Sequence, residues 1–289
     1  MATPGCYSCG HSGRFLFYKL AANGDRYSVL ECENCGLWQI DPIPSEETLN
    51  QLYEKEYFEK RTDRGYDNYK SEQIRKSVES TFQKNLTDLG FFEWQKTLFE
   101  RSMLEVGCAG GYFVEYMQNQ GWQAEGVEVS PSMAEFAQSR GLNVTLGDFL
   151  ALDYGEKKYQ LIALWATIEH LANAKDFIEK MSTLLAPEGR LIISTCHTGY
   201  FARRYKDKWR FLNVPEHIYY FNLRSLKDLF AAAGLKLSKS FTYGSGFTGK
   251  ADASRLYRFK KKIADWLAKK YHLGDMIVCQ YENVKKEQS

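Results

Sequence analysis

The sequence predicts an α/β protein in which a mainly parallel sheet follows a small cysteine-bearing module and a helical segment. From residue 102 onward, short apolar runs alternate with segments of helical period, and strands that alternate with helices form parallel sheets with right-handed crossovers. Before that point, four of the seven cysteines lie within the first 35 residues. The length of 289 residues allows one large domain with an appendage, or two modest domains.

The composition excludes several classes of protein. Hydrophobic residues make up 44% of the chain and charged residues 26%, which is typical of a globular protein. The formal net charge of +2 argues against a surface devoted to nucleic acid. No segment approaches the ~18 consecutive apolar residues of a membrane span, and residues 1–10 lack the apolar stretch of a signal peptide. We therefore expect a cytoplasmic protein that does not cross a membrane.

The N-terminal cysteines form two similar motifs, C-Y-S-C-G at Cys6–Gly10 and C-E-N-C-G at Cys32–Gly36. Each motif supplies two thiolates, and four thiolates make a closed tetrahedral zinc site without an open coordination position. We therefore predict a structural zinc site. An alternating apolar stretch broken by Asn23-Gly24 predicts a β-hairpin between the motifs. The predicted zinc ligands are Cys6, Cys9, Cys32 and Cys35.

Composition changes along the chain predict three segments. Residues 1–41 form a zinc ribbon that ends at the proline-rich Asp41–Pro44. Residues 42–100 are polar, charged and rich in aromatic side chains, and we expect a helical linker that caps the following domain. Residues 101–289 form the α/β domain. The remaining cysteines are expected to be small apolar core residues, namely Cys108, Cys196 and Cys279.

Seven apolar runs in the α/β domain are expected to be strands. They are Met103–Val106, Ala124–Val129, Asn143–Leu146, Tyr159–Trp165, Arg190–Thr195, Leu235–Tyr243 and Met276–Tyr281. The clearest helices between them are Tyr112–Asn119, Pro131–Ser139, Asp176–Leu185 and a helix that starts near Asn222 or Ser225 and ends at Gly234. A basic amphipathic helix is expected within Arg255–Lys270, and we interpret its apolar stripe as the face that packs on the protein.

The first of these strands ends in L-E-V-G-C-A-G-G-Y-F, where small residues permit a tight strand-to-helix turn close to a ligand. Glu128 ends the second strand, at the spacing from Gly107 that places a carboxylate on both hydroxyls of a ribose. A dinucleotide is the natural alternative ligand. However, Glu105 stands just before the turn, and its carboxylate would repel a pyrophosphate but suits an ammonium group. We therefore favour a cofactor with an aminoacyl end.

Five motifs in order resemble those of the class I S-adenosylmethionine-dependent methyltransferases. They are E-V-G-C-A-G-G at Glu105–Gly111, Glu128, G-D-F at Gly147–Phe149, W-A-T-I-E-H-L at Trp165–Leu171 and P-E-G-R-L-I-I-S-T at Pro187–Thr195. The resemblance covers about residues 100–285. It implies a Rossmann-like seven-stranded sheet whose last strand runs antiparallel.

The resemblance also implies roles in cofactor binding. Glu105 and the turn Gly107–Gly111 would hold the methionine end, Glu128 the ribose hydroxyls, and Asp148 with Phe149 the adenine. Ala109 stands where the family usually has its middle glycine. The full implied set is Glu105, Gly107, Ala109, Gly111, Glu128, Val129, Asp148, Phe149 and Trp165.

Methyl transfer is an in-line displacement, so an enzyme must align the acceptor, exclude water and remove the acceptor's proton. His170 follows the fourth strand and His217 lies in P-E-H-I-Y-Y-F, and either is a candidate base, with Tyr220 as a helper. For His170 we prefer a structural role that orders its loop. Some relatives hold magnesium through carboxylates around the E-H pair. Here Ala166 and Thr167 replace part of that cluster, so we do not expect metal-assisted catalysis.

These observations predict a methyltransferase that acts on a small molecule. Sugar C-methyltransferases similarly join a four-cysteine zinc module to this fold, so an anionic or nucleotide-linked sugar is the first choice, with C- and O-methylation both open. The basic and aromatic segment Tyr200–Phe211 suits a phosphorylated acceptor. The alternatives are an RNA methyltransferase whose ribbon binds nucleic acid and a catalytically silent scaffold. The ribbon's balanced charge argues against the first, and the complete cofactor motifs argue against the second.

Overall fold

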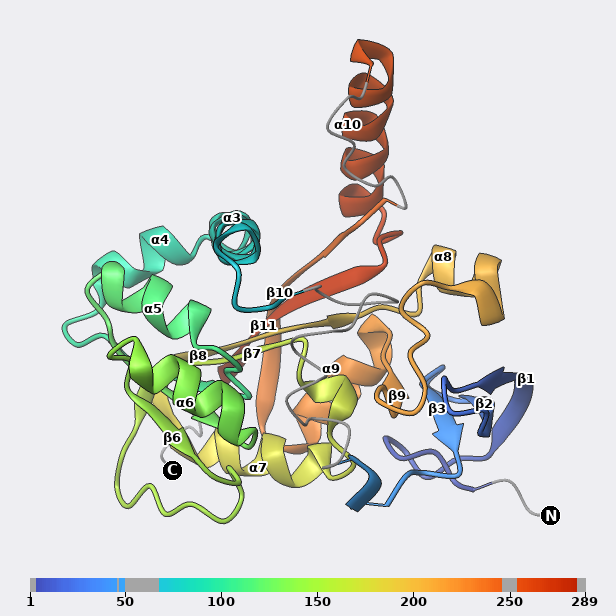
Figure 1. Ribbon diagram of the computed structural model, residues 1–289, viewed down its shortest axis with the longest axis horizontal. Helices are drawn as coiled ribbons and strands as arrows, with labels where there is room; N and C mark the ends of the chain where they lie inside the picture. The colour runs from blue at the N-terminus through green and yellow to red at the C-terminus, as the bar shows by residue number, and fades with distance from the viewer. Residues whose placement is uncertain (1–3, 46, 50–67, 246–253, 285–289) are drawn as a thin grey trace.

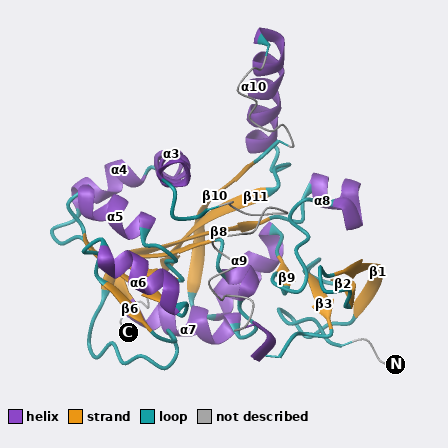
Figure 2. Ribbon diagram, viewed as in Figure 1, coloured by secondary structure: helices purple, strands orange, loops and turns teal. Residues whose placement is uncertain are grey.

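Two β-sheets organise the chain in the computed structural model, which describes residues 4–45, 47–49, 68–245 and 254–284 (Figure 1). Part of the predicted linker, residues 46 and 50–67, lies outside the described residues. Figure 2 shows the helices in two layers around the larger sheet, with the smaller sheet beside its carboxyl edge. The predicted α/β class with an N-terminal cysteine-bearing module is confirmed.

The larger sheet has seven strands in the order β10-β11-β8-β7-β4-β5-β6. The strands β4 to β8 pair in parallel, whereas β11 is antiparallel to both of its neighbours, as the family resemblance implies. All seven strands predicted from the apolar runs are present. Their bounds are β4 Ser102–Val106, β5 Gln123–Glu128, β6 Val144–Leu146, β7 Tyr159–Trp165, β8 Leu185–Cys196, β10 Leu235–Tyr243 and β11 Met276–Asn283.

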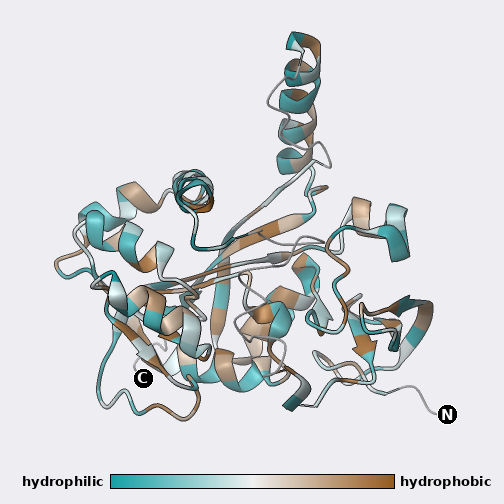
Figure 3. Ribbon diagram, viewed as in Figure 1, coloured by the Kyte–Doolittle hydropathy of each residue, from teal (hydrophilic) through white to brown (hydrophobic). Residues whose placement is uncertain are grey.

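Helices cover both faces of this sheet, and each face has its own apolar core. Alternation along the strands sends Met103 and Ile192 into the core under α3, α5 and α6, and their neighbours Leu104 and Ile193 into the core under α7 and α9. Figure 3 shows the apolar strands between more polar helices. The helices are α3 Glu72–Leu89, α4 Phe91–Trp94, α5 Tyr112–Asn119, α6 Pro131–Ser139, α7 Ala174–Leu184, α8 Tyr200–Tyr205, α9 Leu223–Ala232 and α10 Arg255–Lys270, with 3-10 turns η1 Gln95–Thr97, η2 Ile168–His170 and η3 Lys206–Lys208.

The smaller sheet has four antiparallel strands, β1 Gly13–Leu20, β2 Arg26–Cys32, β3 Trp38–Asp41 and β9 Tyr219–Tyr220. The predicted hairpin between the cysteine motifs is confirmed by the pairing of β1 with β2. The strand β9 was not predicted. It comes from the P-E-H-I-Y-Y-F segment of the α/β domain, where Trp38 pairs with Tyr220 and the amide of Ile40 donates to the carbonyl of Ile218 at 3.1 Å.

Further contacts tie the N-terminal module to the α/β domain. The rings of Tyr7 and Tyr219 stack with centroids 4.3 Å apart. The side-chain amide of Asn222, which also caps α9, donates to the carbonyl of Cys35 at 2.9 Å. The buried carboxylate of Glu31 accepts from the indole of Trp38 and from Arg14 and Arg203, each arginine nitrogen lying 2.6 Å from an oxygen. Arg203 belongs to α8, so Glu31 links the two parts of the chain.

Replacing Glu31 by glutamine is expected to destabilise the protein by about 1–2 kcal/mol at pH 7. Burial alone would raise the pKa of this carboxyl, but the hydrogen bonds from Arg14 and Arg203 outweigh it and lower the pKa. A group with a lowered pKa in the folded state stabilises the fold above its unfolded pKa of about 4.3, and this stability is lost as pH falls below that value. Urea unfolding of wild type and E31Q should therefore differ at pH 7 and converge below about pH 4.

The matched control for this variant is Glu33→Gln, because Glu33 is exposed on the same module and its carboxylate accepts a hydrogen bond from the hydroxyl of Ser12. Glu33→Gln should leave the free energy of unfolding nearly unchanged. Equal losses in the two variants, or a difference that persists at low pH, would show that Glu31 does not act through its ion pairs.

The position of α10 differs from the sequence prediction. Its apolar stripe was expected to pack on the protein, but Ala268 is the single residue of the helix that is buried. That prediction is wrong, because the helix turns smaller and polar side chains toward β10 instead. Within the described part of the chain, no helix combines the length and the apolar character needed to cross a membrane.

Candidate active site

A cavity of about 500 Å³ opens at the carboxyl ends of β4, β5, β7 and β8. This is the edge at which open α/β sheets bind their ligands. The helix α3 and the segment 211–217 form its other walls. Of the described residues, the cavity is lined by Tyr69, Ser77, Val78, Thr81, Phe82, Val106, Gly107, Ala109, Val127, Glu128, Val129, Gly147, Phe149, Trp165, Ala166, Thr167, Glu169, His170, Leu171, Phe177, Ser194, Phe211, Asn213, Glu216, His217, Tyr243 and Met276.

The glycine-rich turn forms one wall in the tight conformation that the sequence predicts. Gly107 has φ 71°, and a Cβ there would lie 2.6 Å from Cγ2 of Thr167, so both conformation and space require glycine. Ala109 has φ 45°, a left-handed conformation that costs an alanine about 1 kcal/mol. The turn forms despite this departure from the family's glycine, because the amide of Ala109 donates to Oε2 of Glu128 at 2.7 Å.

Glu128 lies at the end of β5 with both carboxylate oxygens engaged. Oε1 accepts from the amide of Ser130 at 2.8 Å and Oε2 accepts from Ala109. Burial raises the pKa of this carboxyl, and the backbone hydrogen bonds partly offset the effect. The two amides fix the orientation of the carboxylate at the cavity wall, where its remaining lone pairs can accept from a ligand.

Glu105 lies behind the turn and is not one of the residues that line the cavity. Its side chain is buried, and Oε2 has no hydrogen-bond partner among the described residues. Burial and the nearby charge of Glu128 raise the pKa of Glu105 well above its usual value. A buried carboxylate with an unsatisfied oxygen is stabilised by a nearby cation. The raised pKa favours the neutral acid, and a cation brought close to the turn would favour the ionised form.

The other residues of the implied cofactor set divide into two groups. Val129, Phe149 and Trp165 line the cavity, where they supply apolar walls. Gly111 and Asp148 are not among its lining residues. Asp148 is exposed, and its carboxylate accepts from the amide of Leu150 at 2.9 Å.

The two histidines also line the cavity, and their rings are perpendicular with centroids 4.6 Å apart. Nδ1 of His170 lies 3.0 Å from the carbonyl of Glu216, and Nδ1 of His217 lies 3.0 Å from the carbonyl of Phe211. A carbonyl only accepts, so each Nδ1 carries the proton and Nε2 is the basic nitrogen of the neutral ring. Both rings are therefore in the tautomer that can accept a proton at Nε2.

Glu169 completes this group, which sequence reasoning did not assign to the site. It is buried, Oε2 has no hydrogen-bond partner among the described residues, and burial raises its pKa to about 7. The turn η2 presents Glu169 and His170 together. The amide of Ile218 donates to the carbonyl of Glu169 at 2.8 Å, which brings His217 beside them. A hydrogen bond between segments about fifty residues apart leaves no signal in the sequence.

One carboxylate and two imidazoles can hold a divalent metal ion. The ligand atoms of Glu169, His170 and His217 lie within 4.8 Å of one another. We did not expect metal-assisted catalysis because Ala166 and Thr167 precede the E-H pair. The fold nevertheless brings a further possible ligand, His217, to this pair from a distant segment.

Tyr220 does not join the cavity wall. Its ring lies 5.8 Å from that of His217, and its hydroxyl donates to the carbonyl of Asn213 at 3.2 Å. In contrast, Tyr243 was missed by sequence reasoning. Its hydroxyl lies 2.7 Å from that of Ser194, and both residues line the cavity. Its position as the last residue of a predicted strand was the available signal.

Two arginines of the basic segment that was expected to suit a phosphorylated acceptor have other partners. Arg203 pairs with Glu31, and Arg210 pairs with Asp275 at 3.1 Å beside the indole of Trp209. None of the described residues that line the cavity is lysine or arginine. These arginines therefore anchor the segment that covers the cavity and do not form its wall.

Comparison with known proteins decides the family. A family model described as a methyltransferase domain matches residues 66–240, which is more than half of the chain. The chain belongs to this family.

Three relatives illustrate the extent of the similarity. The methyltransferase is 28% identical over 127 residues to a ubiquinone biosynthesis O-methyltransferase of Coxiella burnetii, a match that covers 42% of this chain and 54% of the relative. It thus spans about half the length of that curated relative. Magnesium protoporphyrin IX methyltransferase of Synechocystis, solved with bound S-adenosylhomocysteine, has a TM-score of 0.55 at 14% identity and covers 82% of this chain and 99% of its own. A methyltransferase of Archaeoglobus fulgidus has a TM-score of 0.52 at 16% identity, with 72% and 94% covered.

These structures, together with the strand order, establish the fold as that of a class I S-adenosylmethionine-dependent methyltransferase. The match to the family model begins at residue 66, so the N-terminal module lies outside it. The properties of that module therefore have to be judged from its own geometry.

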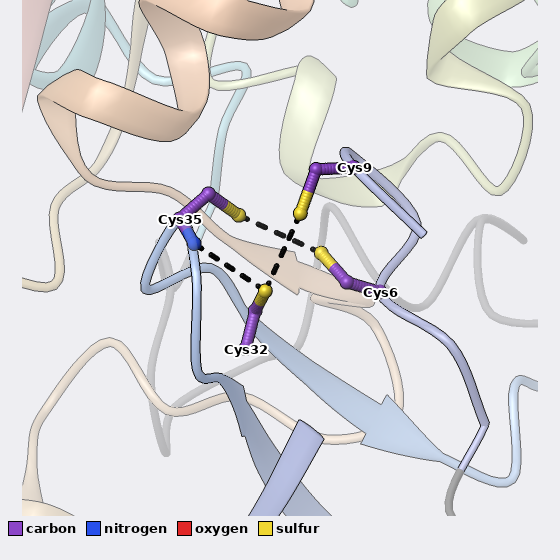
Figure 4. Close-up of side chains that lie close together, drawn as sticks. All are labelled: Cys6, Cys9, Cys32 and Cys35. Carbon is purple, nitrogen blue, oxygen red and sulfur yellow. Dashed lines mark hydrogen bonds between the residues drawn. The ribbon is translucent and has the colours of Figure 1, made fainter. Parts of the chain in front are cut away.

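The four N-terminal cysteines of the methyltransferase converge as predicted (Figure 4). The Sγ atoms of Cys6 and Cys35 lie 3.6 Å apart, and those of Cys9 and Cys32 lie 3.4 Å apart. Four sulfurs at 2.3 Å from a tetrahedral zinc would be separated by about 3.8 Å, whereas a disulfide requires about 2.05 Å. The amide of Cys35 also donates to Sγ of Cys32 at 3.4 Å. The donor set therefore fits zinc.

Proposed function

We propose that this methyltransferase transfers a methyl group from S-adenosylmethionine to a hydroxyl group of a small molecule, with His217 as the base. The observation that carries the proposal is a single cavity lined by the glycine-rich turn and Glu128, which we call the first wall, and by the two histidines, which we call the second or acceptor wall. The same cavity can therefore bind the methyl donor and deprotonate the acceptor. The relatives named as O-methyltransferases support transfer to oxygen.

The residues of the first wall support S-adenosylmethionine as the donor. When bound, this cofactor supplies a methyl group on a positively charged sulfur. Glu128 would accept from the ribose hydroxyls, and Phe149 with Val129 would enclose the adenine. The buried carboxylate of Glu105 would balance the charge of the ammonium group. Its unsatisfied oxygen supports this role, because a cation nearby compensates the cost of its burial.

The second wall supports an acceptor whose reacting end is uncharged. Phe211, whose carbonyl accepts from Nδ1 of His217, gives this wall an aromatic ring, and the described lining of the cavity includes no lysine or arginine. A ring that bears a hydroxyl, such as a sugar or a phenol, fits such a wall. If the acceptor carries a phosphate or a nucleotide, as the resemblance to sugar methyltransferases implies, that part extends beyond the described wall.

The histidines supply the proton transfer that O-methylation requires. Nε2 of His217 would accept the acceptor's hydroxyl proton, and S-adenosylmethionine would supply the methyl group to the oxygen and leave as a neutral thioether, so that the ring would become an imidazolium. The Nδ1 hydrogen bond to Phe211 holds the ring in place during this step. Burial raises the pKa of Glu169 to about 7, and once ionised this carboxylate would stabilise the imidazolium beside it.

The direct test is transfer of radiolabelled methyl from S-adenosylmethionine to panels of phenols, sugars, nucleotide-linked sugars and RNA. The proposal expects label in a small molecule that has a free hydroxyl on a ring, with mass spectrometry placing the methyl on oxygen. Label on carbon would favour the C-methylation that the sequence also left open. Label confined to RNA would overturn the proposed substrate class.

Replacing Glu128 by alanine is expected to weaken the affinity for S-adenosylmethionine by about 1.5–3 kcal/mol, or roughly ten- to a hundredfold, because a charge-assisted acceptor is lost. Titration calorimetry measures this directly. The matched control is Glu125→Ala on the same strand, since Glu125 pairs with Lys157 and does not line the cavity. Equal affinity of E128A and wild type would show that Glu128 does not bind the ribose.

A further inference from the structure

The helix α10 presents its apolar side to solvent. Its five large apolar side chains are between 37% and 61% exposed, and all fall within an arc of about 100° on the helix. They are Leu256, Phe259, Ile263, Trp266 and Leu267. Tyr271, directly after the helix, is 56% exposed. We call the five side chains the outer stripe.

The opposite side of α10 faces the protein. The less exposed residues of the helix are Tyr257, Lys261, Ala264, Asp265, Ala268 and Lys269. At the base, the hydroxyl of Thr242 donates to the carbonyl of Ala268 at 2.7 Å, and Lys269 pairs with Asp88 of α3. The helix is therefore anchored at its C-terminal end with the outer stripe directed away from the body, from which it projects in Figure 1.

Cations surround the outer stripe. The helix contains seven lysine and arginine residues and one aspartate, Asp265, which pairs with Lys261 at 2.6 Å. Of the remaining cations, Lys269 pairs with Asp88. The others form no ion pair with a residue that the structure describes, and they are Arg255, Arg258, Lys260, Lys262 and Lys270. On the helix, Arg255 and Lys262 flank one edge of the stripe and Lys260 the other, while Lys270 lies within it.

We propose that α10 binds the surface of an anionic lipid bilayer, with the outer stripe inserted at the level of the headgroups. Basic helices with a tryptophan- and phenylalanine-bearing apolar face lie in this way at membrane interfaces, since the cations meet anionic headgroups while the apolar side chains leave water. A second copy of α10 fits the surface less well, because pairing the stripes would bring two sets of cations together. A nucleic acid would satisfy the cations but not Leu256, Ile263 and Leu267.

The test is co-sedimentation of the full chain with vesicles of phosphatidylcholine alone or with added phosphatidylglycerol. The proposal expects at least tenfold tighter binding to the vesicles that contain phosphatidylglycerol, and weaker binding as salt rises, because exposed charges are screened. The double variant Phe259→Glu/Ile263→Glu should lose at least tenfold in vesicle affinity. The variant Lys260→Glu/Lys262→Glu should lose the preference for phosphatidylglycerol.

The matched control is Phe99→Glu, because Phe99 is fully exposed and lies outside α10. It should bind vesicles as wild type does. Unchanged circular dichroism and unchanged affinity for S-adenosylmethionine in the α10 variants show that they fold, and these readouts do not depend on the acceptor. Vesicle binding that is equal in wild type and the Phe259 and Ile263 variant would overturn the proposal. A chain that binds no vesicles would also overturn the proposal if it self-associates, or binds an acidic protein or RNA, and if the Phe259 and Ile263 substitutions abolish that association.

Discussion

Replacing His217 by alanine is expected to lower kcat by a hundredfold or more while leaving the affinity for S-adenosylmethionine unchanged. General-base catalysis by a positioned imidazole contributes about 10²–10⁴ to the rate. The ring lines the cavity but is not among the residues that we assign to cofactor binding, so the variant should still bind the cofactor. A protonated imidazole cannot accept the acceptor's proton, so wild type should also lose activity in acid, and this acidic limb should be absent in the variant.

Two further variants separate catalysis from positioning. Tyr220→Phe is the matched control, since Tyr220 contacts His217 but does not line the cavity, and it should keep kcat within severalfold. In His170→Ala, we expect a smaller loss of kcat and an unchanged pH profile, because His170 orders the loop that carries Glu169. Full activity of the His217 variant would exclude it as the base. Loss of the acidic limb in the His170 variant alone would transfer that role to His170.

Replacing Cys35 by serine is expected to remove the metal ion and to destabilise the N-terminal module by about 4 kcal/mol or more. Structural zinc in small modules contributes its binding free energy, ≈ 10–16 kcal/mol in isolated fingers, directly to folding. For a chain of this size such a loss corresponds to a fall in Tm of roughly 10 °C. Metal analysis should find one zinc per wild-type chain and none in the variant. The matched control is Cys279→Ala, a buried thiol in β11 that should leave the zinc content at one.

The same substitution should reach the acceptor wall. The strand β9 belongs to the smaller sheet and begins two residues after His217. Loss of the module therefore removes β3, the strand that pairs with Tyr219 and Tyr220. Hydrogen exchange should accelerate in residues 38–41 and 216–221 but not in β4 and β5. Cofactor affinity should persist while turnover falls. A chain that contains no zinc before substitution, or unchanged exchange near His217, would contradict this account.

The fold was largely predictable because its signals are local. Each strand of the larger sheet is an apolar run, and α9 has a cap at Asn222 and a terminating Gly234 at the expected positions. The cysteine motifs likewise carry their spacing in the sequence. The glycine-rich motif likewise predicts the tight turn at Gly107, where backbone conformation and space both require glycine.

The rest depends on contacts between distant segments. The strand β9 has two residues and no periodicity, and it exists because β3 offers an edge. Glu169 joins His217 through a backbone hydrogen bond that no side-chain pattern encodes. The amphipathic pattern of α10 was recognised, but periodicity does not say whether the apolar side faces the protein or solvent. Tertiary packing decides that orientation. In this protein the side of α10 that carries the buried Ala268 faces β10.

The fourth strand of the smaller sheet constrains how such a protein can be recombined. A module that ends near Asp41 in the sequence looks exchangeable between relatives. However, its sheet is completed by Tyr219 and Tyr220, and its buried Glu31 is neutralised in part by Arg203. A graft of the first 41 residues alone would leave an open sheet edge and a buried Glu31 that keeps Arg14 but lacks Arg203. The unit of inheritance is therefore discontinuous, and it consists of the ribbon together with the segment that carries His217.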